Sequence, residues 1–372
     1  MNRFLVFFAF GSSVFAQAPA RPKPVVSPQV NDDKSVTFRL RAPGAQEVFA
    51  NPEGMPRIAM TKGEDGIWTA TTPVLQPDLY GYTFNVDGVG RMDPGTSLMK
   101  PNIQNLSSMV HVPGPPSLPW EITDIPHGAL DHRFYHSTVV GDDRDYFVYT
   151  PPGYDPTART QYPVFYLLHG YSDDASGWTS VGRANFILDH LIAEGKAKPM
   201  IVVMTLGYGA PEIVARNSGA SLANPELRTK NYNLYRDALF TEVMPQVEKQ
   251  YRASKDRSMR AIGGLSMGGA ESLFVGLNAI DKFAYVGAFS AGGLPQEFDT
   301  VFPKLDAAAN KQLKLLWVAC GTEDRLIEQN RKFREWLKTK GVEHVDIETP
   351  GAHTWLVWRR NLAAFAPLLF QK

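Results

Sequence analysis

The second part of the sequence alternates apolar runs with helix-like segments, and this alternation limits the fold more than any other feature. From residue 129 onward, apolar runs end in Gly, Ser or polar turns, as in YPVFYLLHG, PMIVVMTLG, SMRAIGGLS, FAYVGAFSAGG and LKLLWVACG. Between two of them, RANFILDHLIAEG places Ile187 and Leu191, and also Leu188 and Ile192, four residues apart, as on one face of a helix. Residues 129–372 are therefore predicted to form a doubly wound α/β domain, with a mostly parallel sheet and helices on both faces.

The preceding part of the chain follows a different pattern. Residues 25–112 contain VTFRLRAP, GIWTATTP and LYGYTFNVDG, which alternate with period two, and no segment there has a helical stripe. This pattern predicts a small, immunoglobulin-like all-β sandwich. Residues 113–128, PGPPSLPWEITDIPHG, are dense in proline and are predicted to form a linker between the two domains.

The first residues have the features of a signal peptide. Arg3 is followed by an apolar run from Phe4 to Phe10, and Val14 and Ala16 suit cleavage by a signal peptidase. The run is too short to cross a bilayer of about 30 Å as a helix. Residues 1–16 are therefore predicted to be removed on export to the periplasm or the medium; the alternative is a buried N-terminal strand.

Charge and cysteine content exclude several classes of function. The chain has 38 basic and 38 acidic residues and no Lys/Arg cluster, so it has no electrostatic basis for non-specific nucleic-acid binding. The single cysteine, Cys320, excludes an internal disulfide and a cysteine-based zinc site. We expect no metal, no organic cofactor and no membrane partner; the oligomeric state is left open.

A serine within a glycine-rich turn is the first candidate catalytic residue. Gly264-Leu265-Ser266-Met267-Gly268 has the pattern G-x-S-x-G, in which a sharp turn from strand to helix presents a serine hydroxyl as nucleophile. By itself this pattern is common, and its alternative interpretation is a flexible turn. Here SMRAIGG before it reads as a buried strand and AESLFVGLNAI after it as a helix, which is the context that the motif requires.

A serine nucleophile needs a base and an acid, which follow it along the chain in this fold. His344 and His353 are the histidines after Ser266. His344 lies inside an alternating strand, whereas His353 follows that strand in the loop PGAHTW, so His353 is the predicted base. The acid is predicted from the loop GTEDRL, where Asp324 is preferred to Glu323, although Asp324 could instead cap the next helix.

Backbone N–H groups must stabilise the negative charge that develops on the substrate oxygen. We expect them from Met267, which follows the nucleophile, and from Tyr171 in the loop HGYSDDASGW. His169 is expected to brace that loop by hydrogen bonding rather than to take part in catalysis. Ser290, in AFSAGG, also ends a strand, but no helix follows it, and it is not expected to be the nucleophile.

Four aromatic residues are candidates for an aromatic acyl pocket. They are Trp178, Tyr208, Trp355 and Trp358, and the alternative for each is packing in the core. The long, polar, glycine-rich segment Leu206–Tyr232 is expected to form a lid or a wall of the pocket.

Five motifs in order resemble one known family. YLLHGYSDDASGW, GGLSMGGAESL, KFAYVGAFSA, CGTEDRLI and GAHTWLVW, within residues 131–372, resemble the esterase D group of α/β-hydrolases, most of all the feruloyl and acetyl-xylan esterases of carbohydrate esterase family 1. The resemblance implies that the family's catalytic Ser, Asp and His fall on Ser266, Asp324 and His353. It also implies an ester of a polysaccharide or oligosaccharide as the substrate.

The N-terminal part resembles, more weakly, the early-set sandwich or family-48 carbohydrate-binding module that is found beside some of these esterases. Trp68, Tyr80 and Tyr82 could stack on sugar rings there, while core packing is the favoured alternative.

The expected function is that of an exported serine esterase that removes feruloyl, or else acetyl, groups from a plant polysaccharide such as arabinoxylan. Two alternatives stay open: a siderophore esterase of the enterochelin type, and an acyltransferase of the mycolyltransferase type, which passes the acyl group to a sugar instead of water.

Overall fold

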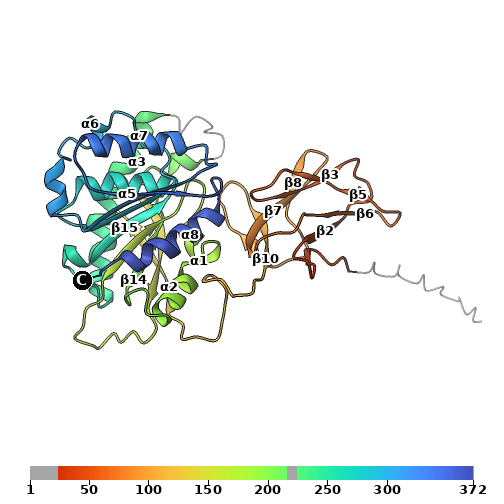
Figure 1. The fold of residues 1–372 in the computed structure, drawn as a ribbon, viewed down its shortest axis with the longest axis horizontal. Helices are drawn as coiled ribbons and strands as arrows, with labels where there is room; N and C mark the ends of the chain where they lie inside the picture. Colours follow the sequence, from red (N-terminus) through yellow and green to blue (C-terminus); the bar gives the residue numbers. More distant parts are fainter. Residues whose placement is uncertain (1–23, 216–223, 372) are drawn as a thin grey trace, which may run out of the picture.

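The computed structural model describes residues 24–215 and 224–371, and the predicted signal peptide lies outside them. A β-sandwich, red to orange in Figure 1, lies beside a larger domain of sheet and helices, drawn from yellow to blue. The predicted fold class, an α/β-hydrolase sheet preceded by an all-β sandwich, is confirmed.

The sandwich consists of two antiparallel sheets. One has the strand order β1-β2-β6-β5, and the other has the order β4-β3-β7-β10-β9 with β8 paired to β7. The strands are β1 (Gln29–Val30), β2 (Val36–Arg41), β3 (Val48–Pro52), β4 (Ile58–Ala59), β5 (Thr61–Lys62), β6 (Ile67–Thr71), β7 (Asp78–Val86), β8 (Val89–Arg91), β9 (Met99–Lys100) and β10 (Ser107–Val112).

The aromatic residues of the sandwich face inward. Trp68, Tyr80 and Tyr82 are 7%, 7% and 2% exposed and belong to the core between the two sheets. The Tyr82 hydroxyl donates to buried Asp93, and the Trp68 indole donates to the carbonyl of Ala42. These three side chains therefore cannot stack on a sugar, and the alternative of core packing holds for them.

The linker, residues 113–128, contains no helix or strand, but it is fixed to the second domain. Trp120 is buried, His127 pairs with Asp189, and the Gly128 N–H donates to the same carboxylate. Strand β11 then begins at Ala129.

The second domain is built on an eight-stranded sheet with the order β11-β12-β14-β13-β15-β16-β17-β18. Strands β11, β12 and β14 pair antiparallel, and the pairs from β14 onward are parallel. The strands are β11 (Ala129–Ser137), β12 (Asp142–Thr150), β13 (Val164–Leu168), β14 (Ile201–Thr205), β15 (Arg260–Leu265), β16 (Tyr285–Phe289), β17 (Leu315–Gly321) and β18 (Val345–Thr349).

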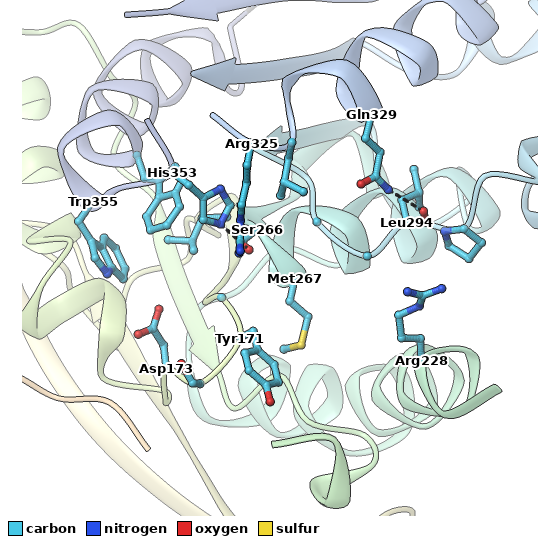
Figure 2. A pocket seen from close by; sticks show the side chains of 18 of the residues that line it. Tyr171, Asp173, Arg228, Ser266, Met267, Leu294, Arg325, Gln329, His353 and Trp355 are labelled. Atoms are coloured by element: carbon cyan, nitrogen blue, oxygen red, sulfur yellow. Dashed lines mark hydrogen bonds between the residues drawn. The ribbon is translucent and has the colours of Figure 1, made fainter. Parts of the chain in front are cut away.

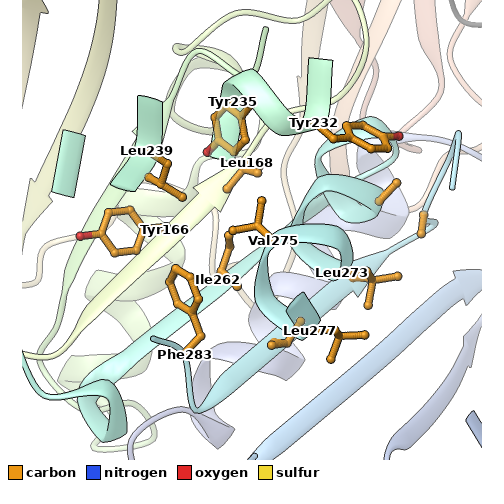
Figure 3. Close-up of a cluster of buried hydrophobic side chains, with 14 of the residues drawn as sticks. Tyr166, Leu168, Tyr232, Tyr235, Leu239, Ile262, Leu273, Val275, Leu277 and Phe283 are labelled. Atoms are coloured by element: carbon orange, nitrogen blue, oxygen red, sulfur yellow. The ribbon is translucent and has the colours of Figure 1, made fainter. Parts of the chain in front are cut away.

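Helices cover both faces of this sheet because its central strands are apolar on both sides. In β13, Phe165 and Leu167 face a core shared with α1, α2 and α8, whereas Tyr166 and Leu168 face a core shared with α3, α4, α5 and α7 (Figure 3). The helices are α1 (Gly177–Ser180), α2 (Ala184–Ala193), α3 (Pro225–Ala238), α4 (Met244–Gln250), α5 (Met267–Asn278), α6 (Phe298–Val301), α7 (Ile327–Thr339) and α8 (Trp355–Phe365). Short 3-10 turns lie at Pro211–Val214, Arg257–Met259, Ala307–Lys311 and Ala366–Leu368, and a π-helical turn (Leu239–Val243) joins α3 to α4. Within the described residues, no helix has the length and apolar character needed to cross a membrane.

Helix α8 ties the sandwich to the α/β domain. Arg359 donates to Asp78 and to the carbonyl of Leu79, both in β7, and Arg360 donates to the other oxygen of Asp78. The side chains of Arg359 and Asp78 are completely buried. Because removal of Asp78 would leave the buried Arg359 without its carboxylate partner, this ion pair couples the two domains strongly.

Candidate active site

Ser266 occupies a strained turn between β15 and α5. Its φ of 51° lies in the left-handed region, which a residue with a side chain adopts at a cost of about 1–3 kcal/mol. Close approach of neighbouring backbone explains the adjacent glycines. A Cβ at Gly268 would lie 2.3 Å from the carbonyl oxygen of His169, and one at Gly264 would lie 2.6 Å from that of Leu168. The local sequence therefore enforces a turn that raises the Ser266 side chain above the sheet.

The structure brings Ser266, His353 and Asp324 together at the carboxyl edge of the sheet. His353 Nε2 lies 2.9 Å from Ser266 Oγ, and His353 Nδ1 lies 2.7 Å from Asp324 Oδ2. His353 comes from the loop after β18, and Asp324 comes from the loop after β17. When a hydroxyl, an imidazole and a carboxylate are hydrogen-bonded in this order, a proton can pass from the serine to the histidine.

Asp324 is fixed and ionised in this arrangement. Burial opposes its charge, but hydrogen bonds from His353, the Leu326 N–H and Ser290 outweigh that effect and hold the pKa of Asp324 below its usual value. Glu323, the alternative acid, is exposed, and Asp324 is the residue at the histidine. Asp324 also accepts from the Leu326 N–H at 2.9 Å, close to the start of α7, so it combines this contact with the histidine contact.

The two predicted donors to a substrate oxygen lie beside Ser266. Met267 and Tyr171 line the same pocket as the serine, and their backbone N–H groups donate to no acceptor in residues 24–215 and 224–371. His169 is buried behind the loop of Tyr171. It accepts at Nε2 from the Gly207 N–H and contacts the Gly170 carbonyl through Nδ1, which agrees with the expected bracing contact. Burial lowers the pKa of His169, so the ring is neutral.

A pocket of about 1050 Å³ opens over Ser266 (Figure 2). Of the four aromatic residues predicted to line it, Trp355 and Trp358 do. Trp178 and Tyr208 do not, and their assignment to the pocket was wrong. Trp178 is fully buried with its indole donating to the carbonyl of Leu168, and the Tyr208 hydroxyl donates to the carbonyl of Asp173. Both side chains satisfy backbone carbonyls beneath the pocket instead of facing it.

The predicted lid segment contributes to the pocket only in part. Pro225 and Arg228, at the start of α3, line the pocket, whereas residues 206–215 form a buried turn with Ile213 and Val214 in the core. Residues 216–223 lie outside the described part of the chain.

Three pocket residues that the sequence analysis missed come from the sandwich: Glu53, Lys100 and Asn102. Glu53 accepts hydrogen bonds from Lys100 and from the Trp355 N–H at the start of α8. Burial opposes ionisation of Glu53, but Lys100 and Arg359 keep its pKa below the usual value. No local pattern could have revealed these residues, because only the packing of the two domains brings them to the site. Asp173, in the loop HGYSDDASGW, was also missed.

The described residues contain no group of three His, Cys, Asp or Glu side chains that could hold a metal ion.

Comparisons with known proteins show the family of this chain. Residues 137–369 match the model of a family described as putative esterase. The chain is 31% identical over 353 residues to the endo-1,4-beta-xylanase/feruloyl esterase of Xylanibacter ruminicola, a match that covers 92% of this chain and 46% of that protein. The chain thus spans about half the length of this curated relative.

Solved structures of esterases share the fold. The CE1 ferulic acid esterase of the anaerobic fungus Anaeromyces mucronatus matches with a TM-score of 0.58 and 25% identity, over 67% of this chain and 93% of that one. The enterobactin esterase of Shigella flexneri matches with a TM-score of 0.69 and 17% identity, over 91% and 93% of the two chains. The second match covers most of both domains, but at that identity it speaks for the fold alone.

Proposed function

Because the chain belongs to the esterase family whose model spans residues 137–369, we propose that it is a serine carboxylic-ester hydrolase that releases feruloyl groups, or else acetyl groups, from plant cell-wall polysaccharide such as arabinoxylan. The observation that carries the proposal is the hydrogen-bonded chain from Ser266 through His353 to Asp324, which opens into the pocket. The likeness to the xylanase/feruloyl esterase and to the ferulic acid esterase supports the choice of substrate.

The reaction follows from the geometry. Ser266 Oγ attacks the ester carbonyl while His353 Nε2 takes its proton, and Asp324 holds the imidazole through Nδ1. The N–H groups of Met267 and Tyr171 stabilise the negative charge on the carbonyl oxygen. His353 then gives its proton to the leaving alcohol, and water activated by His353 releases the acid from the acyl-enzyme.

The size of the pocket supports a feruloyl group ahead of an acetyl group. The pocket is lined in part by Met267, Leu294, Pro295 and Leu326, which can contact an aromatic ring. The pocket must hold both halves of the ester, and an acetyl group would leave the part that these four side chains line largely unfilled.

The test uses protein beginning at Gln17, beside the Ser266→Ala variant, on methyl ferulate, feruloylated arabinoxylan fragments, acetylated xylan and p-nitrophenyl acetate. Release of ferulate that disappears in the variant is the expected result. Release of acetate alone would keep the mechanism and change the substrate. No Ser266-dependent turnover of any of these esters would overturn the proposal.

Two alternatives are tested in the same assay. Ser266-dependent cleavage of enterobactin without cleavage of ferulate esters would favour a siderophore esterase. The enterobactin esterase of Shigella flexneri has the same fold as this chain. Transfer of the acyl group to excess sugar in place of water would identify an acyltransferase. Export belongs to the proposal as well, and detection of the processed chain outside the cytoplasm would test it.

A further inference from the structure

The pocket extends to both sides of Ser266. In Figure 2, Leu294 and Gln329 lie on one side of Ser266, while Trp355 and Asp173 lie on the other. The second side continues into the sandwich through Lys100 and Asn102. Carboxylate, ammonium and amide groups on this side form a surface suited to a ligand that carries hydroxyl groups.

Asp173 is a nearly buried polar residue on that second side. It is 5% exposed, yet it lines the pocket. Its backbone is held by a hydrogen bond from its N–H to the Gly170 carbonyl and by one from the Tyr208 hydroxyl to its own carbonyl. Its Oδ1 accepts from Asn102 Nδ2 at 3.0 Å. Within the described residues, no donor reaches its other oxygen, Oδ2.

The free oxygen of Asp173 borders the reacting centre. A Cβ placed on Gly170 would lie 3.6 Å from Asp173 Oδ2 and 3.4 Å from Ser266 Cβ, so Oδ2 lies no more than about 7 Å from Ser266 Cβ. Oδ2 is open to the pocket, so a hydroxyl group of the substrate can reach it as a hydrogen-bond donor.

A hydroxyl group is the substrate group that fits this position best. Burial raises the pKa of Asp173 to about 7, against the opposing effects of Lys100 and Asn102, so near neutral pH the carboxyl is present both with and without its proton. A hydroxyl can donate to the ionised form and accept from the protonated form, which a cation or an anion cannot do.

The position of His353 indicates which half of the ester reaches Asp173. His353 must lie near the leaving oxygen to protonate it. Trp355 follows His353 by two residues and lies on the same side of Ser266 as Asp173 (Figure 2). The alcohol half of the ester therefore extends toward Asp173, and the acyl half extends toward Leu294.

We propose that Asp173 determines specificity for the alcohol half of the ester by hydrogen bonding to a sugar hydroxyl group there, with Asn102 of the sandwich fixing its orientation. This inference rests on the proposed function and names the part of the substrate that the second side of the pocket recognises.

Two ferulate esters that differ only in the alcohol test the inference: methyl ferulate and a ferulate ester of arabinose. For Asp173→Ala we expect kcat/KM on the sugar ester to fall by about tenfold or more beyond any loss on methyl ferulate. Asp173→Asn retains a carbonyl oxygen and should lose less. An equal loss on both esters for both variants would overturn the inference.

The matched control is Asp174→Asn. The Asp174 carboxylate accepts from the N–H and hydroxyl of Ser176 and does not line the pocket, so the ratio between the two esters should stay unchanged in this variant.

A binding measurement separates this inference from the proposed function. In the Ser266→Ala background, an arabinose-substituted xylo-oligosaccharide without an acyl group should bind at least about fivefold more weakly when Asp173 is also changed to Ala. If no ferulate ester is hydrolysed but this difference is found, the proposed function fails and sugar recognition by Asp173 stands. Equal binding by both proteins would refute the role of Asp173 even if ferulate is released.

Discussion

Ser266 and Ser290 end neighbouring parallel strands, β15 and β16, and share a φ of 51°, yet their surroundings differ completely. Ser266 is followed directly by helix α5, lines the pocket and contacts His353. Ser290 is fully buried; its hydroxyl accepts from the Trp358 indole and helps to hold the pKa of Asp324 low.

The difference shows that a positive φ at a serine that follows a strand is not enough to make that serine a nucleophile. Access to the pocket and a base within hydrogen-bond reach decide the role. Ser290 instead supports the acid of the triad from behind. The neighbouring strand β17 adds a third case, because its Cys320 is also fully buried.

Loss of the Ser266 hydroxyl should have the largest effect. Ser266→Ala removes the atom that attacks the carbonyl, so kcat should fall by about 10⁴- to 10⁶-fold on p-nitrophenyl acetate while the melting temperature hardly changes. Steady-state kinetics and thermal unfolding check both statements. Retention of activity within tenfold would mean that another residue attacks the ester.

Replacement of the acid should cost less than replacement of the nucleophile. Asp324→Asn retains the shape but loses the charge that orients His353, so we expect kcat to fall about 10³- to 10⁴-fold. The parallel variant Glu323→Gln changes an exposed carboxyl in the same loop and should stay within about twofold of the original rate. Similar losses of kcat in both variants would contradict the assignment of Asp324, rather than Glu323, as the acid of the triad.

Ser290 should affect the reaction rate only indirectly, through its contacts with Asp324 and Trp358. Ser290→Ala removes a hydrogen bond to Asp324 and the acceptor for Trp358, and kcat should fall about two- to tenfold, in line with the loss of one or two hydrogen bonds. Ser290→Gly also lacks the hydroxyl but tolerates a positive φ, so it separates this loss from backbone strain. A loss as large as that of Ser266→Ala would contradict the comparison.

The pH dependence of stability provides a smaller test of the Asp324 environment. Since the pKa of Asp324 is lower in the folded chain than in the unfolded one, its ionisation stabilises the fold above the unfolded pKa of about 3.9, and this contribution is lost as the pH falls through the folded pKa. The melting temperature of the original chain should therefore approach that of Asp324→Asn as the pH falls from 7 to 3. A constant difference would show that the charge contributes nothing.

The sequence predicted those parts of the site that depend on local order along the chain. Strand, glycine turn and helix placed Ser266, and the loops after the next strands placed Asp324 and His353. Trp178 and Tyr208 could not be separated from Trp355 and Trp358, because all four side chains are buried and only the three-dimensional arrangement shows which of them border the pocket. The sequence could not predict the pocket positions of Glu53, Lys100 and Asn102. They follow from the packing of α8 and of the loop HGYSDDASGW against the sandwich.

The smallest expected effect belongs to Cys320, the third potential nucleophile at adjacent strand ends. Burial raises the pKa of its thiol to about 12, and the nucleophilic thiolate is therefore almost absent near neutral pH. Native protein treated with iodoacetamide should keep its full activity and its unmodified mass, whereas unfolded protein should gain one adduct. Loss of activity on alkylation of the native chain would mean that the end of β17 opens to solvent. Burial would then not be what distinguishes Cys320 and Ser290 from Ser266.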